Sequence, residues 1–442
     1  MDELPEPDAE ARRASKELNA RLLAWIAGDG GWIGFDRFMA GALYEPGLGY
    51  YTGGSRRFGR DGDFVTAPEI SPLFGACIAG QCARWFETLG ARRIVEFGAG
   101  TGQLAAQVLN GLARDGITDV DYRIVELSAP LRQVQRHTLE ALAPELAPCV
   151  SWLESLPERI EAVVIGNELI DAMPVRLFRL DDGLVLERGV GAAVDAPEAL
   201  PDAPFASPFR FVDRPADPDF ARRVLDALAA SGWAQGDEPL SAWGSGYQSE
   251  FAEQGPAWLA SVGERLVRGV VLLFDYGFPA SEYYHPQRNG GTLACHYRHR
   301  VHHDPLILAG LQDLTAHVDF SALARAAADV GLDCIGFGSQ GSFLLGAGLL
   351  EHLARSAEPG STAYLRQAQA VGRLVSEAEM GELFKAIAFA RGGDFDAAAF
   401  ERSDRRGALG ACAAEAAEAK RAKNEGSVSL PTSPGWPPGR RR

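Results

Sequence analysis

Residues 94–105 read IVEFGAGTGQLA, an apolar run that leads into three alternating glycines and then into a helix-favouring segment. Gly98, Gly100 and Gly102 allow the backbone to adopt positive φ angles and to approach a ligand closely. The helix that follows presents free backbone N–H groups at its N-terminus. This strand–loop–helix pattern predicts a nucleotide-binding loop in an α/β domain.

Two carboxylates indicate which nucleotide is bound. The dinucleotide fingerprint requires a small residue where this chain has Gln103, and Glu96 beside the loop would repel a pyrophosphate. A carboxylate there suits the cationic amino-acid group of S-adenosylmethionine (SAM). Glu126 ends the next apolar run, where a carboxylate can accept both ribose hydroxyls. We therefore predict SAM as the cofactor, with Thr101, Leu127 and Asn167 also in its site.

Five apolar runs alternate with helix-favouring segments from residue 92 onward. Such alternation predicts a parallel sheet with helices on both faces. With the glycine loop and its carboxylates, it predicts an α/β fold with the Rossmann-like sheet of a class I methyltransferase. The runs are RRIVEFG (92–98), VDYRIVEL (120–127), CVSWL (149–153), AVVIGNEL (162–169) and GVVLLFDYG (269–277).

The spacing of these runs also predicts the domain organisation. About a hundred residues separate the fourth run from the fifth, which is far longer than a usual strand connection and indicates an insertion. Its first part resembles a β-hairpin that turns at Asp182 and Gly183, followed by a Pro- and Ala-rich linker and two helical patterns, at 220–230 and 249–266. The predicted parts are a helical N-terminal cap with a cofactor-covering loop (1–90), a methyltransferase core (91–175 and 268–392), an inserted substrate-binding subdomain (176–267) and a helical or disordered tail (393–442).

The composition limits the partners. The 442 residues are 46% hydrophobic and 23% charged, as in an ordinary globular protein, and they contain no apolar stretch long enough for membrane insertion. The formal net charge of -16 argues against a nucleic-acid partner and favours a basic substrate group. Six scattered cysteines without a C-x-x-C pair are typical of reduced thiols.

Polar side chains end the fourth and fifth runs. Asn167, Glu168 and Asp171 follow the fourth run, and Asp275 and Tyr276 end the fifth. The C-terminal edge of such a sheet is where ligands bind, so we expect these five residues to be catalytic. The alternative is a capped turn with solvated acids. A guanidinium stays protonated, and an enzyme that methylates it needs carboxylates to orient it; this pattern therefore favours an arginine over a lysine as the acceptor.

A histidine-rich stretch, GTLACHYRHRVHHDP (291–305), has three alternative interpretations: a metal site, a surface histidine run and a functional lid. Arg298 and Arg300 lie among the histidines, and their fixed positive charges would oppose a divalent cation. The spacing matches no known zinc motif. We therefore expect no metal site.

Several motifs between about residue 20 and residue 390 together resemble the MidA-like family of methyltransferases. They include IGFDRFMAGALYEPGLGYY (33–51), FGRDGDFVTAPEISPLFG (58–75), IVEFGAGTGQLA (94–105), NELIDAMPV (167–175), FDYGFPASEYY (274–284), RNGGTLACHYRH (288–299) and DLTAHVDFSALA (313–324). The resemblance implies a SAM-dependent class I methyltransferase with a helical N-terminal cap. Eukaryotic members are similar to an enzyme that methylates an arginine of a core subunit of respiratory complex I, so a protein substrate is implied.

The resemblance also assigns two segments that composition alone leaves open. The loop before the first run would close over SAM, with Asp63, Phe64 and Thr66 against the cofactor, although plain turn chemistry would account for its glycines. The histidine-rich stretch and the segment after it would form a substrate lid, to which we assign His296, Arg298, His299 and His317.

Two other functions share some of these features. One is an aminopropyl transferase acting on decarboxylated SAM, and the other is a non-catalytic assembly chaperone that only binds its client. The acidic, apolar-poor N-terminus and the C-terminal tail depart from the eukaryotic pattern. On this basis we expect a bacterial, cytoplasmic protein and regard a mitochondrial matrix location as disfavoured.

Overall fold

The computed structural model describes residues 4–53, 66–193, 205–234 and 240–410, and its main feature there is a sheet of eight strands. Seven of them follow the order β15-β16-β10-β5-β2-β3-β4, and β14 pairs with the end of β10. The strands are β2 (Arg93–Phe97), β3 (Asp121–Val125), β4 (Val150–Leu153), β5 (Ile160–Asn167), β10 (Leu266–Phe278), β14 (Val318–Asp319), β15 (Asp333–Ser339) and β16 (Phe384–Arg391).

The strand directions confirm the predicted fold class. Strands β4, β3, β2, β5 and β10 are parallel to their neighbours, and β16 runs antiparallel between β10 and β15. The strand order changes direction between β2 and β5, and ligands bind at such a switch point in open α/β sheets. The glycine loop after β2 and the polar turn after β5 therefore meet at one edge.

Helices cover both faces of this sheet because alternate strand residues point to opposite sides. Ile94 belongs to the core under α4 and α5, whereas the next residue, Val95, belongs to the core under α8 and α10. The first face carries α4 (Pro72–Leu89), α5 (Gln103–Arg114), α11 (Gln340–Gly346), α12 (Leu349–Ser356) and α13 (Thr362–Val375), and the second carries α8 (Gln254–Arg265) and α10 (Phe320–Asp329).

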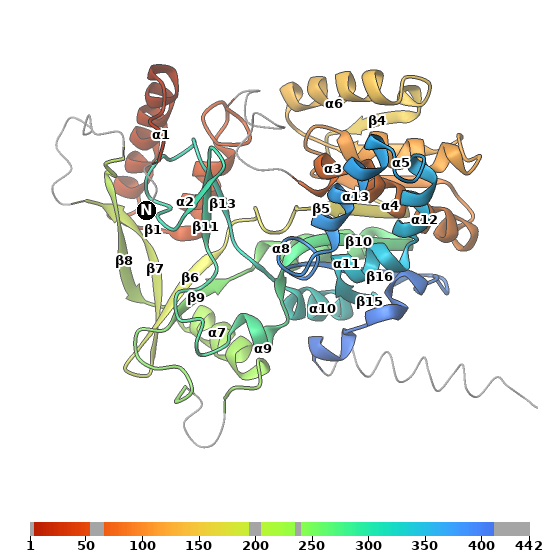
Figure 1. The fold of residues 1–442 in the computed structure, drawn as a ribbon. Coiled ribbons are helices and arrows are strands. Elements are labelled where there is room, and N and C mark those ends of the chain that lie inside the picture. Colours follow the sequence, from red (N-terminus) through yellow and green to blue (C-terminus); the bar gives the residue numbers. More distant parts are fainter. Residues whose placement is uncertain (1–3, 54–65, 194–204, 235–239, 411–442) are drawn as a thin grey trace, which may run out of the picture.

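The N-terminal helices and the inserted strands form a second lobe, seen beside the main sheet in Figure 1. Its five-stranded sheet has the order β1-β7-β6-β9, with β8 on β7, so that β1 from the N-terminal segment pairs with an inserted strand. Leu22 and Phe38 of the helices share one core with Val190 of β7. The elements are α1 (Ala9–Gly28), β1 (Ile33–Gly34), α2 (Phe35–Tyr44), β6 (Arg176–Asp181), β7 (Leu184–Ala192), β8 (Phe209–Pro215), α7 (Pro218–Ala230) and β9 (Gln248–Phe251).

The structure both supports and corrects the local predictions for the insertion. The hairpin turn lies at Asp182 and Gly183, whose φ angles are 45° and 80°. The helix predicted over 249–266 is wrong at its start, because β9 occupies 248–251 and α8 begins only at Gln254. Pairing with β6 makes this segment a strand, and tertiary pairing of this kind outweighs a weak local preference.

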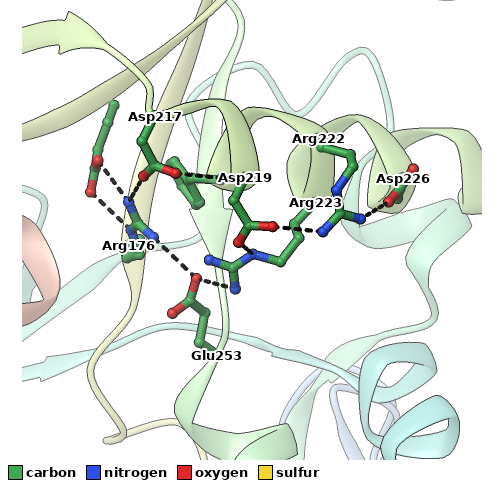
Figure 2. A network of polar contacts seen from close by, with 9 residues as sticks. Arg176, Asp217, Asp219, Arg222, Arg223, Asp226 and Glu253 are labelled. Atoms are coloured by element: carbon green, nitrogen blue, oxygen red, sulfur yellow. Dashed lines mark hydrogen bonds and ion pairs between the residues drawn. The ribbon is translucent and has the colours of Figure 1, made fainter.

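An ion-pair network connects the start of β6 with α7 and the start of α8 within the insertion (Figure 2). Arg176, at the start of β6, makes two hydrogen bonds to Glu187, at 2.9 and 2.7 Å, and lies 3.3 Å from both Asp217 and Glu253. Arg223 of α7 continues the network to Glu253 at 2.7 Å. Because the Arg176 and Glu187 side chains are only 15% and 12% exposed, removing one partner would leave a poorly solvated charge.

The segments at the two ends of the core also differ in detail from the sequence pattern. The helix-favouring segment before the first core strand forms two helices, α3 (Ala67–Ile70) and α4, because Ser71 between them is extended with φ −152°. Phe395 and Phe400 pack into the core, so that part of the segment assigned to the tail covers the sheet. No helix in the described ranges combines the length and the apolar character needed to cross a bilayer.

Candidate functional site

A cavity of about 760 Å³ lies at the switch point, between the main sheet and the N-terminal segment. This volume is within the usual range for a cofactor or drug-sized ligand. It is lined by the loops after β2, β3 and β5, by α3, by Trp258 of α8 and by the segment between Tyr44 and Thr52. The predicted residues among its walls are Thr66, Glu96, Gly98, Gly100, Thr101, Glu126, Leu127, Asn167 and Glu168.

Other predicted residues lie elsewhere. Asp63 and Phe64 are outside the described residues, so the loop predicted to close over SAM can be followed only from Thr66 onward. The cavity walls do not include Gly102, Asp171, Asp275, Tyr276, His296, Arg298, His299 or His317.

The glycine loop leaves room for a ligand. Gly98, Gly100 and Gly102 have φ angles of 65°, 50° and 82°, which glycine adopts without steric cost. A Cβ on Gly100 would meet no atom within 4 Å, whereas a Cβ on Gly102 would lie 3.1 Å from Gln135. Gly100 therefore faces open space in the cavity, and Gly102 allows the helices α5 and α6 (Ala129–Leu142) to approach each other.

Glu96 lies at the end of β2, with only 1% of its surface exposed. The Tyr122 hydroxyl donates a hydrogen bond of 2.8 Å to its carboxylate, and burial raises the pKa of Glu96 to about 7. A cation that binds nearby would favour the ionised form and lower this pKa. The arrangement suits the ammonium group of an amino-acid ligand.

Glu126 is held in place at both oxygens. The Ser128 backbone N–H donates to Oε1 at 2.7 Å, and the Gln135 side-chain amide donates to Oε2 at 3.2 Å. The neighbouring Leu127 is 72% exposed and lines the same cavity. A fixed carboxylate beside an apolar side chain fits a ribose attached to a flat base, so the residues present fit SAM.

The turn after β5 carries an unusual conformation at the cavity wall. Glu168 has a φ angle of 49°, which is uncommon for a residue with a side chain and points to a functional constraint. The Asn167 side-chain amide donates to Glu168 Oε1 at 3.3 Å, and burial followed by the charge of Asp171 raises the pKa of Glu168 to about 8. Asn167 Oδ1 is buried and has no hydrogen-bond partner within the described ranges.

Asp275 and Asp171 lie behind this turn. Asp275 Oδ2 accepts hydrogen bonds from the backbone N–H groups of residues 169, 170 and 171, at 3.2, 2.8 and 3.2 Å, and Oδ1 accepts from Tyr276 N–H at 2.9 Å. Asp275 thus stabilises the backbone conformation of the turn after β5. Asp171 is 6% exposed, and burial raises its pKa to about 6. Tyr276 packs edge-on against His317, with ring centroids 4.9 Å apart.

Among the wall residues that the sequence did not single out are a carboxylate and two stacked tyrosines. Glu69 of α3 accepts a hydrogen bond of 3.4 Å from Thr66 N–H, and burial raises its pKa. Tyr44 and Tyr51 are stacked, with ring centroids 5.4 Å apart. The Tyr44 hydroxyl donates to the Ala172 carbonyl at 2.9 Å. The T-x-x-E capping box at 66–69 was a local signal for Glu69, but the wall position of all three residues depends on the fold.

The histidine-rich stretch forms a hairpin of β11 (Ala294–Tyr297) and β12 (Arg300–His302). Its turn residues Arg298 and His299 have positive φ angles of 46° and 61°, and Arg298 Nη1 donates to the Glu6 carbonyl at 3.1 Å. Across the described part of the chain, no group of three or more His, Cys, Asp or Glu side chains is placed to hold a metal. The hairpin thus contacts the N-terminal segment, and its role as a lid stays a prediction.

The strand order and the glycine loop with a carboxylate after each of the first two core strands define a class I SAM-dependent methyltransferase. The chain belongs to the family described as "Putative S-adenosyl-L-methionine-dependent methyltransferase", whose model matches residues 77–338. This confirms the resemblance found in the sequence, and SAM is the cofactor.

Relatives and solved structures agree with this assignment. The chain is 28% identical over 405 residues to "Protein arginine methyltransferase NDUFAF7, mitochondrial" of Danio rerio, covering 84% of this chain and 87% of that one. The corresponding human protein is 26% identical over 401 residues, covering 84% and 82%. A crystal structure of a Burkholderia thailandensis protein bound to S-adenosyl-homocysteine (SAH) is 48% identical, with a TM-score of 0.82, covering 91% of this chain and 99% of that chain.

One prediction from the sequence is wrong. A bacterial, cytoplasmic location was expected, but the zebrafish, fruit fly and human relatives are all named as mitochondrial proteins. The acidic N-terminal composition has a structural explanation instead. Asp8 caps α1 by accepting hydrogen bonds from the N–H groups of Glu10 and Ala11, and Glu10 lies in the first turn, where a negative charge stabilises a helix.

Proposed function

We propose that this methyltransferase transfers the methyl group of SAM to an arginine side chain of a protein. The observation that carries the proposal is Glu168, a half-buried carboxylate in a strained turn at the cavity wall whose pKa is raised to about 8. A carboxylate held in this way gains a partner when a cation enters the cavity. The names of the relatives support the same acceptor, since they are called protein arginine methyltransferases.

The cofactor half of the cavity is assigned to the loops after β2 and β3. In this proposal Glu96 receives the ammonium group and Glu126 receives the ribose hydroxyls, while the backbone of Gly98, Gly100 and Thr101 lies against the cofactor. Leu127 covers the base from the cavity rim. Asn167 is assigned to both halves: its side-chain amide donates to Glu168, and its buried Oδ1, which has no hydrogen-bond partner among the described residues, can accept from the cofactor.

The acceptor half is assigned to Glu168, Glu69, Tyr44 and Tyr51. Two carboxylates from different elements line this part of the cavity, and the charge of Glu69 contributes to the raised pKa of Glu168. A planar guanidinium can bind carboxylates through two parallel hydrogen bonds and can also stack on an aromatic ring. A lysine ammonium lacks the planar fork, so these walls favour arginine.

The chemistry required of the protein follows from this arrangement. Bound SAM supplies a methyl group that is already electrophilic, and the N–C bond forms as the S–C bond breaks, with its electron pair left on sulfur. The protein must therefore hold the acceptor nitrogen in line and exclude competing water. Glu168 orients the guanidinium and accepts the proton that the nitrogen loses, before passing it to solvent.

The class of client follows from charge and from the resemblance. A net charge of -16 favours a client with a basic segment around the target arginine. The resemblance to the MidA-like family implies a core subunit of respiratory complex I as one such client. The basic segment of the client and the complex I subunit are therefore parts of the proposed function.

The test uses the full chain, methyl-labelled SAM and three matched peptides that present arginine, lysine or only an α-amino group. We expect label on the arginine peptide, recovered as methylarginine after hydrolysis. Label on lysine or on the chain terminus would overturn the proposal. A Gly100→Val variant serves as the inactive control, because its cofactor loop should no longer accept SAM.

The same assay separates the two alternative functions. An aminopropyl transferase would use decarboxylated SAM and transfer a three-carbon amine, which differs in mass from a methyl group. A non-catalytic chaperone would bind the client equally well when Gly100→Val removes cofactor binding, and it would leave every peptide unlabelled. Methylarginine formation with SAM alone contradicts both.

A further inference from the structure

Gln135 is a fully buried polar residue beside the cofactor half, and the motifs in the sequence did not single it out. It lies in α6 with 0% of its surface exposed. Its Nε2 donates to the Gly100 carbonyl at 3.1 Å and to Glu126 Oε2 at 3.2 Å. Its Oε1 accepts from the indole N–H of Trp152 at 2.8 Å. One side chain therefore joins the glycine loop, the carboxylate after β3 and strand β4.

The orientation of this amide is determined by its partners. A side-chain amide has two N–H donors and one carbonyl oxygen, and here both donors face acceptors while the oxygen faces a donor. Rotating the amide by half a turn would place its oxygen against the Gly100 carbonyl and the Glu126 carboxylate, and its NH₂ against the Trp152 N–H. All three contacts would become unfavourable, so the site has one stable arrangement.

The arrangement fixes the part of Glu126 that faces the ligand. Ser128 N–H holds Oε1 and Gln135 holds Oε2, so the carboxylate cannot rotate and its remaining lone pairs have one direction. Gly102 contributes from the other side, because its lack of a side chain lets Gln135 approach the loop. A group fixed before binding loses less freedom when the ligand arrives.

We propose that Gln135 is a positioning residue that aligns Glu126 and the glycine loop for the ribose of the cofactor. Gln135 itself touches neither the reacting atoms nor the acceptor. Its effect on the cofactor passes through the direction of the Glu126 carboxylate and the position of Gly100. The inference rests on the ribose-binding role proposed for Glu126, and it is independent of whether the acceptor is arginine.

The test compares SAH with its 2′,3′-dideoxyribosyl analogue, measured by calorimetry on the full chain. The unmodified protein should bind SAH more tightly than the analogue. Gln135→Met keeps the size of the side chain and removes the amide, so SAH affinity should fall about tenfold while affinity for the analogue changes little. The ratio of the two dissociation constants, which a general loss of structure would not alter, should move toward one.

Two further variants keep the result interpretable. Gln340→Met is the matched control, because Gln340 is another fully buried glutamine, which donates to the Leu374 carbonyl at 3.2 Å and lies in α11, outside the cavity walls. Its ratio should equal that of the unmodified protein. Trp152→Phe keeps an aromatic ring but removes the indole N–H that holds Oε1 together with part of the ring, and should shift the ratio in the same direction by about threefold. If Gln135→Met does not fold, the ratio of dissociation constants measured for Trp152→Phe tests the proposal instead.

Two results would overturn the inference. Equal weakening of both ligands in Gln135→Met would make Gln135 a structural residue only. If the unmodified protein bound SAH and the analogue equally well, the ribose-binding role of Glu126 would fail and the inference with it. Methylation of a lysine peptide with an intact ribose preference would refute the proposed acceptor and leave the role of Gln135 standing.

Discussion

The two halves of the cavity are built in different ways. In the cofactor half both carboxylates already have hydrogen-bond donors: Tyr122 for the buried Glu96, and Ser128 with Gln135 for the partly exposed Glu126. In the acceptor half, Glu168 receives one side-chain hydrogen bond of 3.3 Å from Asn167 and lies in a strained turn. The cofactor half is therefore organised without a ligand, whereas the acceptor half holds a carboxylate whose charge is poorly compensated.

The difference has a chemical meaning. A cofactor that is the same in every reaction cycle can be met by fixed donors and acceptors, since each fixed group lowers the entropy lost on binding. A cationic acceptor brings the positive charge that the acceptor half lacks. A carboxylate with a raised pKa therefore binds cations in preference to neutral groups. The following predictions test each half separately.

The largest effect is expected from Gly100→Val in the cofactor half. The side chain would enter the cavity, and valine tolerates the φ angle of 50° poorly, so SAM affinity should fall by about a thousandfold or more. Calorimetry measures the loss, and circular dichroism checks that the fold remains. Gly116→Val is the matched control, because Gly116 also has a positive φ of 79° and open space but lies outside the cavity walls. Undiminished SAM binding by Gly100→Val would contradict the assignment of the loop.

In the acceptor half, Glu168→Gln should reduce turnover about a hundredfold while SAM affinity is nearly kept, because orientation of the acceptor is lost and the cofactor loop is untouched. Radiometric turnover and calorimetry with SAH measure the two quantities. Glu161→Gln is the matched control, since Glu161 lies on β5, the strand that leads to Glu168, and is outside the cavity walls. Weakened SAH binding with normal turnover would reverse the assignment of the two halves.

The pH profile gives a second measurement on the same residue. The pKa of Glu168 in the free protein is raised to about 8, so the carboxyl is mostly neutral below this pH and ionised above it. Only the ionised form attracts a cation, so kcat/KM should rise with pH up to about 8 and then level off. An arginine acceptor does not titrate in this range, so Glu168→Gln should lose this rise. At saturating SAM, where the bound ammonium group keeps Glu96 ionised, a rise that persists in the variant would point to a titrating acceptor such as lysine.

The contrast between the halves also explains which parts of the site could be predicted from the sequence. Glu96 lies at the end of one strand, and the three glycines and Glu126 follow this strand and the next, so their local patterns carry the information. The sheet and its cofactor edge were predicted for the same reason. The exposed Leu127 lines the same cavity because it adjoins Glu126.

The acceptor half depends on contacts between distant segments. Tyr44 and Glu69 come from separate N-terminal elements, and only the folded chain brings them to the turn at Asn167 and Glu168. Asp275 is the opposite case, because here a local pattern, the position at the end of a strand, predicted a catalytic group. The structure directs its oxygens to four backbone N–H groups instead, which no local pattern reveals.

A smaller effect is expected for Glu126→Ala. The substitution removes one or two charge-assisted hydrogen bonds to the cofactor, each worth about 1.5–3 kcal/mol, so SAM affinity should fall by at least about tenfold. Turnover at saturating SAM should change little, because the acceptor half is intact. Glu154→Ala is a suitable control, since Glu154 is exposed and lies outside the cavity walls. Loss of turnover without loss of affinity would remove Glu126 from the cofactor site.

The smallest effect is expected for Tyr44→Phe, at the contact between the N-terminal segment and the turn after β5. Its hydroxyl donates to the Ala172 carbonyl at 2.9 Å, and its ring stacks on Tyr51. Removing the hydroxyl leaves the ring as a wall, so the free energy of unfolding should fall by about 1 kcal/mol and kcat by a few-fold. Tyr44→Leu also removes the aromatic wall and should raise KM for the peptide further, because a guanidinium stacks better on an aromatic ring than on an aliphatic side chain. If both variants lowered kcat equally and left the peptide KM unchanged, Tyr44 would only fasten the two lobes, and the acceptor half would consist of the carboxylates alone.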